Sequence, residues 1–179
     1  MTARRRAGPV ATVVVLLAAG LPASVAHGQK PSTDAVVVNV AALYYGVGEL
    51  RWEHRLAERS ALQASLAAGP GSQAAGLTDH WLGKIGVQYR YYFAGGFDEG
   101  LGLAVEVAGL RLLADPYQRQ GLALSPRGVY KIAISSGATA ELQIGGALVA
   151  RAGVDASGEA MPLRWTVQAS IAAALGWSF

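Results

Sequence analysis

Titratable side chains are the first residues to consider for chemistry in this 179-residue chain. It has three widely spaced histidines, His27, His54 and His80, and no cysteine. Structural and catalytic metal sites gather three or four such ligands within a few ångströms. The sequence therefore predicts no metal site and no cofactor.

Carboxylates and glycines are the next candidates. Glu49 and Glu53 share one face of an expected strand, but four residues of strand rise separate them by about 13 Å. That distance is too great for the carboxylate pair of a glycosidase. The glycines of "GPGSQAAG" and "GVGE" lack the Gly-x-Gly-x-x-Gly pattern or the Lys-Ser/Thr context of a nucleotide site. Neither glycoside hydrolysis nor nucleotide binding is expected.

Most other charged residues alternate with apolar ones, which indicates the elements that position them. In "ELRWEHRL" one face carries Glu49, Arg51, Glu53 and Arg55, and the opposite face carries Leu50, Trp52, His54 and Leu56. A period of two is typical of a strand and not of an amphipathic helix. The same alternation runs unbroken over residues 163–179, far beyond the usual strand of about 5 or 6 residues. A soluble core would not cover an apolar face of that length.

Eight segments with this alternation predict an all-β fold over residues 34–179. The expected strands are 34–44, 49–57, 60–69, 81–93, 100–112, 122–134, 138–150 and 163–179. The links "AERS", "AGGFDE" and "SSG" are short and "GPGSQAAGLTDH", "LADPYQRQG" and "VDASGEAMP" are longer, with "YGVG" a short link where a long one is expected. This plan is typical of a bacterial outer-membrane protein. Because lipid satisfies no sheet edge, we predict an eight-stranded antiparallel up-and-down transmembrane β-barrel.

Aromatic residues support a membrane-spanning height. Trp81 and Tyr91 lie ten residues apart on one strand face, which at a tilt of about 40° separates them by roughly 25 Å in height. Trp165 and Trp177 differ by roughly 30 Å on the same reasoning. The predicted membrane-interface aromatics are Trp81, Tyr91, Phe93, Trp165, Trp177 and Phe179.

The N-terminal 26 residues have the layout of a secretory signal peptide. Arg4, Arg5 and Arg6 precede an apolar run over residues 10–21, and the small-x-small site Ser24-Val25-Ala26 follows. The run is too short to span a membrane as a helix. We predict cleavage after Ala26, which leaves residues 27–33 as a short periplasmic segment. Cleavage after Ala23 and a retained anchor are the alternatives.

Cleavage of the signal peptide would lower the net charge of the chain. The whole chain has fifteen Lys and Arg against twelve Asp and Glu, and removal of three arginines leaves twelve of each. A near-neutral mature chain gives no reason to expect nucleic-acid binding. The lack of cysteine excludes a lipoprotein anchor, and no later segment has 18 consecutive apolar residues.

The C-terminal residues resemble a known signature. A terminal Phe179, preceded by Trp177 and by apolar residues at every second position, resembles the C-terminal signature of outer-membrane barrels. In that class the signature is read by the barrel-assembly machinery. The resemblance implies that Trp177 and Phe179 form the assembly signal and that this machinery is a partner during biogenesis.

A longer stretch is similar to a family of small, functionally uncharacterised outer-membrane β-barrel proteins. The similarity rests on "VVVNVAALYYGVGELRWEHRLAERSALQASLAAG" together with "VQYRYYF". The matching positions are Asn39, Gly46, Trp52-Glu53, Leu56 and Ser60-Ala61-Leu62, with Trp52 where the family usually has Tyr. The resemblance implies the barrel fold and no chemistry.

The inward-facing charges are the principal candidate site. They are Glu49, Arg51, Glu53, Arg55, Lys84, Arg90, Glu106, Arg127, Lys131, Glu141 and Arg164. An eight-stranded barrel is only wide enough to be filled by its own side chains, and buried charges persist when they are paired. We therefore expect a charge network that fills the lumen, with a narrow ion or solute path as the alternative.

These observations predict a non-enzymatic integral outer-membrane protein with a structural or loop-mediated binding role. We expect it to be a monomer whose partners are outer-membrane lipids. One alternative is a lipid-modifying acyl hydrolase or transferase, which needs a nucleophile beside a histidine. No H-x-S pair follows His54, as lipid A deacylases would show. The other alternative is a soluble lipid-binding barrel of the lipocalin kind, which would turn its apolar face inward.

Overall fold

The computed structural model describes residues 32–44, 46–70, 80–114, 117–134, 137–154 and 157–179. The predicted signal peptide, its cleavage site and most of the predicted periplasmic segment lie outside these residues. None of the described residues belongs to a helix long and apolar enough to cross a membrane.

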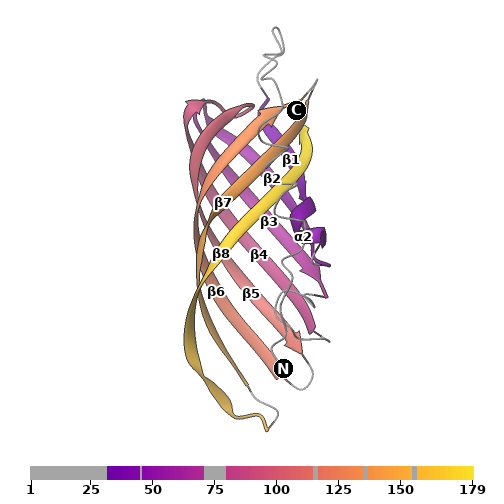
Figure 1. Ribbon diagram of the computed structural model, residues 1–179, viewed down its shortest axis with the longest axis vertical. Coiled ribbons are helices and arrows are strands. Elements are labelled where there is room, and N and C mark those ends of the chain that lie inside the picture. The colour runs from indigo at the N-terminus through magenta and orange to yellow at the C-terminus, as the bar shows by residue number, and fades with distance from the viewer. Residues whose placement is uncertain (1–31, 45, 71–79, 115–116, 135–136, 155–156) are drawn as a thin grey trace, which may run out of the picture.

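Eight antiparallel strands form one sheet that closes into a barrel (Figure 1). They are β1 Asp34–Asn39, β2 Gly48–Ala57, β3 Ser60–Gly69, β4 His80–Gly95, β5 Gly100–Ala114, β6 Tyr117–Ala133, β7 Ala138–Val154 and β8 Ala160–Ser178. Each strand pairs with its neighbours in the sequence, and β1 pairs with β8. The predicted all-β, eight-stranded, up-and-down antiparallel barrel is confirmed.

Alternation along each strand sets the two surfaces of the wall. In β3, Gln63 and Ser65 are buried inside the barrel, whereas Leu62 and Leu66 are exposed outside it. Because successive side chains of a strand point to opposite faces, the same division recurs around the barrel. Polar residues thus fill much of the interior, and large apolar residues cover the outside.

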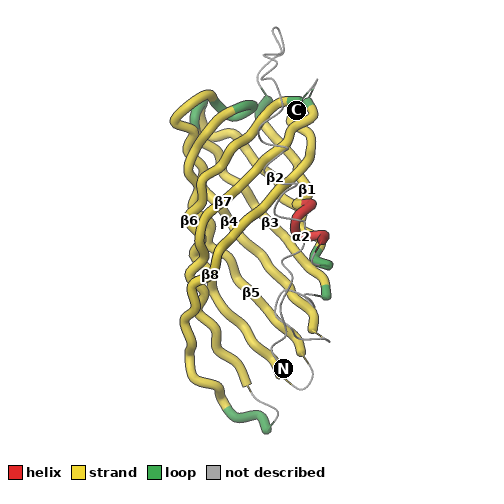
Figure 2. Tube along the Cα trace, in the orientation of Figure 1, coloured by secondary structure: helices red, strands yellow, loops and turns green. Residues whose placement is uncertain are grey.

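Strand β1 is shorter than predicted, because the chain turns into the short helix α2 Val40–Tyr44 after Asn39. The Asn39 side chain accepts a hydrogen bond from the backbone N–H of Ala42 at 3.2 Å, as an N-cap residue does. Gly46 ends the turn with a φ of 78°, which a residue with a side chain rarely adopts. Figure 2 shows α2 on the side of the barrel.

The barrel has two different ends. At the turn end, where Phe179 lies, β2, β4 and β6 are joined to the following strands by short turns. At the loop end, β5, β6, β7 and β8 extend further than predicted, so most of "LADPYQRQG" belongs to strands and not to a loop. Small and polar residues occupy both faces of these extensions, so the period-two alternation is absent there. The sequence pattern therefore did not predict them.

Strand β8 has two neighbours over only part of its length. Residues Ala174 to Ser178 pair with β1, whereas from Ala160 to Ala173 the strand pairs with β7 alone among the described residues. At the closed part the strands approach so closely that a Cβ on Gly176 would lie 2.0 Å from the Val36 carbonyl oxygen. Figure 1 shows β6, β7 and β8 continuing past the ends of β1, β2 and β3.

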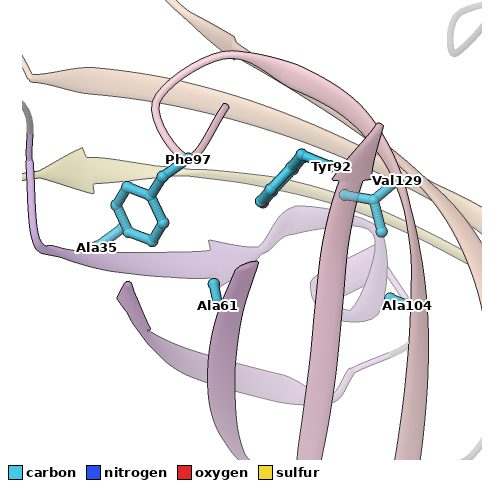
Figure 3. Close-up of a cluster of buried hydrophobic side chains, with 6 residues drawn as sticks. All are labelled: Ala35, Ala61, Tyr92, Phe97, Ala104 and Val129. Atoms are coloured by element: carbon cyan, nitrogen blue, oxygen red, sulfur yellow. The ribbon is translucent and has the colours of Figure 1, made fainter. Parts of the chain in front are cut away.

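An apolar cluster fills the interior at the turn end (Figure 3). Phe97, from the turn between β4 and β5, folds inward and is 1% exposed. It belongs to one cluster with Tyr92 and Val129, and the Lys131 ammonium lies 4.0 Å from the centre of the Phe97 ring. These side chains close the turn end of the barrel.

Candidate functional site

Arg90 is at the centre of the charged interior. It extends from β4 and is completely buried. Its guanidinium donates to Glu53 Oε1 at 3.1 Å, to both carboxylate oxygens of Glu141, to Gln63 Oε1 at 2.7 Å and to Gln88 Oε1 at 2.7 Å. These bonds use all five N–H donors of the side chain. Arg90 therefore joins β2, β3, β4 and β7 through one group.

Glu53 is the second fully buried charge of this group. Its Oε2 accepts from Lys131 Nζ at 2.8 Å, and its Oε1 accepts from the Tyr92 hydroxyl at 2.9 Å in addition to Arg90. Both oxygens are thus satisfied by donors from β4 and β6. A buried carboxylate is tolerated under such conditions because cations and hydrogen bonds replace its lost hydration.

Arg51 connects this group to a second one nearer the loop end. Its Nη1 lies 3.3 Å from Glu141 Oε1, and its Nη2 lies 3.0 Å from Glu49 Oε2. Glu49 Oε1 is in turn 2.8 Å from Lys84 Nζ. The chain of contacts crosses from β7 through β2 to β4.

Glu106, from β5, completes the second group. It lies 2.6 Å from Lys84 Nζ and 2.6 Å from Arg127 Nη2. Arg127 Nη1 also donates to Gln143 Oε1 at 3.0 Å, and Ser65 Oγ donates to Glu106 Oε1 at 3.1 Å. We call the connected residues the interior network. Its charged members are Glu49, Arg51, Glu53, Lys84, Arg90, Glu106, Arg127, Lys131 and Glu141.

Uncharged side chains link these ions, and most of them were not among the predicted site residues. Gln88 Nε2 donates to Gln143 Oε1 at 3.2 Å, Gln143 Nε2 donates to Glu141 Oε1 at 2.5 Å, and Asn39 Nδ2 donates to Glu49 Oε2 at 2.5 Å. The available sequence signal was parity, because Gln88 and Gln143 share the inward face of their strands with a charged residue and Asn39 follows the inward-facing Ala35 and Val37. Because its charged side chains are paired with one another, the network can hold charge inside the barrel and make the wall rigid.

Two of the predicted network residues lie elsewhere. Arg55 is half-buried near the turn end, where its Nη1 donates to the Ser32 carbonyl oxygen at 3.4 Å. Arg164 is exposed at the loop end, where it lines a pocket together with Arg119 and Arg151. The structure joins neither residue to the interior network, because Arg55 lies at the rim of the turn end and Arg164 lies toward the loop end beyond the end of β1.

The predicted interface aromatics all lie on the outer surface. Trp81 and Trp165 lie toward the loop end, and the others lie toward the turn end. All six side chains are exposed. The backbone N–H of Phe179 donates to the Asp34 carbonyl oxygen at 2.8 Å, and the Phe179 carbonyl oxygen accepts from Thr33 and Asp34. The last residue is thus bonded to the start of β1.

His54 forms a polar group with Asp34 on the outer surface near the turn end. Asp34 Oδ1 lies 3.0 Å from His54 Nδ1 and accepts from Trp52 Nε1 at 3.1 Å. A His–Asp pair is one part of a hydrolase triad, which also needs a nucleophile at the other ring nitrogen. Among the described residues no serine or threonine hydroxyl is hydrogen-bonded to His54. The contacts link β1 to β2.

Toward the loop end the barrel has two pockets. One cavity of about 740 Å³ is lined by segments of β3 to β8 and includes Lys84 and Leu110. A second, of about 180 Å³, is lined by Arg119, Arg151 and Arg164 together with neighbouring residues of β7 and β8. No group of three or more potential metal ligands is positioned to bind a metal within the described part of the chain.

No protein-family model, curated protein sequence or solved structure matches this chain. The similarity to outer-membrane barrels therefore stays a prediction from the residues themselves.

Proposed function

We propose that this chain is a non-enzymatic integral β-barrel protein of the bacterial outer membrane, with a structural or binding role. The observation that supports the proposal most directly is the inverted distribution of side chains. Charged residues such as Arg90, Glu53 and Lys131 are fully buried, while large apolar residues from all eight strands are exposed.

The exposed apolar residues form a belt around the barrel. Members from the different strands, all of them exposed, are Val38, Leu50, Leu66, Val87, Leu103, Leu122, Ile144 and Ile171. A monomeric protein in water rarely exposes a continuous apolar surface of more than a few hundred Å². A surrounding bilayer would cover such a belt, and where β1 pairs with β8 the sheet leaves no edge open to lipid.

The same distribution disfavours a soluble barrel of the lipocalin kind. Such a barrel would place its apolar face inside, but the inward faces of β2, β4 and β7 carry Glu, Arg, Lys and Gln. The interior network also disfavours a wide channel, because Arg90, Glu53 and Glu141 fill the turn-end half from several sides. A narrow ion or solute path remains the alternative if these side chains move.

The competing enzymatic function is a lipid acyl hydrolase or transferase. The structural feature that favours it is the His54–Asp34 pair on the outer surface, near the expected membrane interface. Against it, the Asp34 carboxylate also binds Trp52, and the pair has no hydroxyl bonded to it among the described residues. Hydrolysis of a radiolabelled lipopolysaccharide or phospholipid by the wild type, lost in His54→Ala, would establish the enzyme instead.

The proposal includes a secretion route for the chain and a set of binding partners. A cleaved signal peptide would direct the chain across the inner membrane, and Trp177 and Phe179 would present it to the barrel-assembly machinery. The mature protein would be a monomer in contact with outer-membrane lipids. Fractionation of a Gram-negative host, N-terminal sequencing of the mature protein and gel mobility before and after boiling test these points together. We expect His27 at the new N-terminus and faster migration of the unboiled barrel.

A single charge placed in the belt separates a membrane barrel from a soluble one. Val87 lies between Trp81 and Tyr91, one residue from the midpoint, and faces outward. In a bilayer, Val87→Lys should destabilise the barrel by about 2–4 kcal/mol, because lysine at the bilayer midplane loses its hydration. The free energy of unfolding by urea in phospholipid vesicles measures this effect.

The matched control is Glu58→Lys, which places the same side chain in the exposed turn between β2 and β3. We expect a change within about 0.5 kcal/mol for the control. If Val87→Lys were as harmless as the control, the outer surface would face water and the membrane proposal would fail.

A further inference from the structure

Charged side chains are rare on the outer surface of the barrel. Among the strand residues whose side chains the structure describes, the outward-facing charged or histidine residues are Asp34 and His54 near the turn end and Arg111 toward the loop end. The outward positions between these two levels carry uncharged side chains. Arg111 therefore marks the loop-end border of the apolar belt.

Strand alternation and register place Arg111 at the level of a loop-end aromatic residue. Arg111 is exposed and has the same parity along β5 as the exposed residues Val107 and Leu113. It is directly opposite Gly83 of β4, and Leu113 is directly opposite Trp81. Arg111 and Trp81 are thus diagonal neighbours on the outer face, where long side chains come within reach of each other.

Two glycines leave the outer face around Arg111 without side chains. Gly83 is directly opposite it on β4, and Gly109 precedes it by two residues on β5. A Cβ on Gly83 would have its nearest neighbour at 3.9 Å, the Arg111 carbonyl oxygen, and a Cβ on Gly109 would lie 3.7 Å from Ile85 Cγ2. Both are ordinary van der Waals distances, and neither glycine has a positive φ. Packing and backbone geometry therefore do not require glycine at these two positions.

Strand β6 borders the same part of the outer face. Gln120 is directly opposite Arg111, Leu122 is directly opposite Gly109, and both β6 residues are exposed. The Gln120 amide can donate hydrogen bonds, as the guanidinium group does. On the other side of Gly109, Ile85 is its direct partner on β4. The surface thus has hydrogen-bond donors toward the loop end, and below them a glycine between two aliphatic side chains.

We propose that this part of the outer face binds a membrane lipid with a net anionic phosphate head, the phosphate at Arg111 and Gln120 and an acyl chain over Gly109. Arginine binds phosphate in a bidentate manner through charge-assisted hydrogen bonds. A lipid of the loop-end leaflet would hold its head at this border and its chains along the belt. At the turn end the outward-facing pair is Asp34 with His54, whose carboxylate disfavours an anionic head. The inference specifies one partner of the binding role proposed above and rests on that proposal.

Binding is tested with the full mature protein refolded in vesicles, through quenching of tryptophan fluorescence by brominated lipids. The protein carries Trp52→Phe, Trp165→Phe and Trp177→Phe, so that Trp81 is its one tryptophan. The vesicles are equimolar mixtures of phosphatidylcholine and phosphatidylglycerol in which one lipid or the other is brominated. Phosphatidylcholine also has a phosphate but no net charge, so the ratio of the two quenching efficiencies gives the preference for the anionic head. We expect a preference of about fivefold at low salt, as for one basic residue near an anionic membrane surface.

Variants separate this site from a general attraction to anionic lipid. Arg111→Gln should abolish the preference, because the amide has no charge to offer the phosphate. Gly109→Leu keeps the charge but fills the place of the acyl chain, and it should lower the preference as well. The matched control is Arg59→Gln, which removes an exposed arginine at the turn end and should leave the preference unchanged. A second control keeps Trp177 in place of Trp81 as the one tryptophan, and we expect no preference there.

Several results would overturn the proposal. Equal quenching of Trp81 by the two brominated lipids would show that no anionic head is selected. A preference that survives Arg111→Gln, or one equally strong at Trp177, would show an attraction to the whole protein and not to this site. A preference unchanged in Gly109→Leu would overturn the placement of the acyl chain. Quenching by neither lipid would instead contradict the membrane barrel, because a lipid-facing tryptophan is quenched by brominated phosphatidylcholine whatever the head of the bound lipid.

Discussion

The two halves of the barrel enclose the same kind of interior and fill it in opposite ways. In the turn-end half, Arg90, Glu53 and Lys131 are completely buried and bonded to partners from several strands. In the loop-end half, Arg151 and Arg164 face each other across two strands beside a cavity. Both halves carry arginine on the inward face, so residue type alone does not decide whether a charge is paired.

The difference follows from how many strands surround each half. All eight enclose the turn end, which brings β2 and β7 close enough for Arg51 to contact Glu141. Toward the loop end β1 and β2 have stopped, and β8 pairs with β7 alone among the described residues. Inward-facing side chains there have fewer strands across the barrel from which a partner can come. Strand length thus determines whether an inward-facing charge becomes part of a network.

The largest effect is expected from breaking the network at its centre. Arg90→Ala leaves Glu53 and Glu141 buried with part of their cationic partners removed, which should lower the free energy of unfolding by about 3–5 kcal/mol. Urea unfolding in vesicles measures the change. Arg119→Ala at the loop end is the matched control and should change stability by no more than about 0.5 kcal/mol. Equal losses for the two variants would remove the distinction between the halves.

A smaller loss of stability is expected at the turn-end seam. Deletion of Phe179 removes one apolar side chain worth about 1.5–3 kcal/mol of burial and the backbone bonds to Asp34. If Phe179 is also the assembly signal, outer-membrane levels in the cell should fall sharply, while the same variant refolded in detergent micelles should still close. Equal outer-membrane levels of the deletion and the wild type would show that Phe179 is only the last lipid-facing residue.

The smallest effect is expected from relieving repulsion at the loop end. Arg164→Gln removes one of two opposed like charges and should stabilise the ligand-free barrel by less than about 0.5 kcal/mol. Because these groups are partly exposed, the effect should shrink as salt is added. Urea unfolding at low and high salt measures it. A destabilisation of 1 kcal/mol or more would mean that Arg164 has a favourable partner in the empty barrel.

The sequence predicted the strands of the barrel and the faces of their side chains better than the contacts between side chains inside it. Alternation identified which residues face inward, including Glu53, Arg90 and Glu141, because side-chain parity is a local property of a strand. Parity carries no information about height or about partners across the barrel. Arg90 and Arg164 therefore looked equivalent in the sequence, although one is completely buried and the other is exposed.

The local features that escaped prediction have identifiable causes. The turn at α2 depends on the Asn39 side chain bonding to Ala42, a contact that competes with continuation of β1. The extension of β6 carries Gln118, Arg119 and Gln120 in succession, and that of β8 consists of Ala160, Met161 and Pro162, so neither alternates polar with apolar residues. The amides Gln63 and Gln143 were missed because an uncharged polar residue on an inward face gives no sign of its partner.

The seam between β1 and β8 has a consequence for the order of folding. Ala35 pairs with Ser178 and Thr33 is bonded to Phe179, so closure joins the beginning of the described chain to its last residue. Contacts between residues so distant in sequence form slowly, because the entropy of a very large loop is lost before the seam stabilises it. The other strand pairs are hairpins that can form as their sequences emerge. The barrel cannot close until the whole chain has been synthesised, and until then the edges of β1 and β8 are open to pairing with other strands.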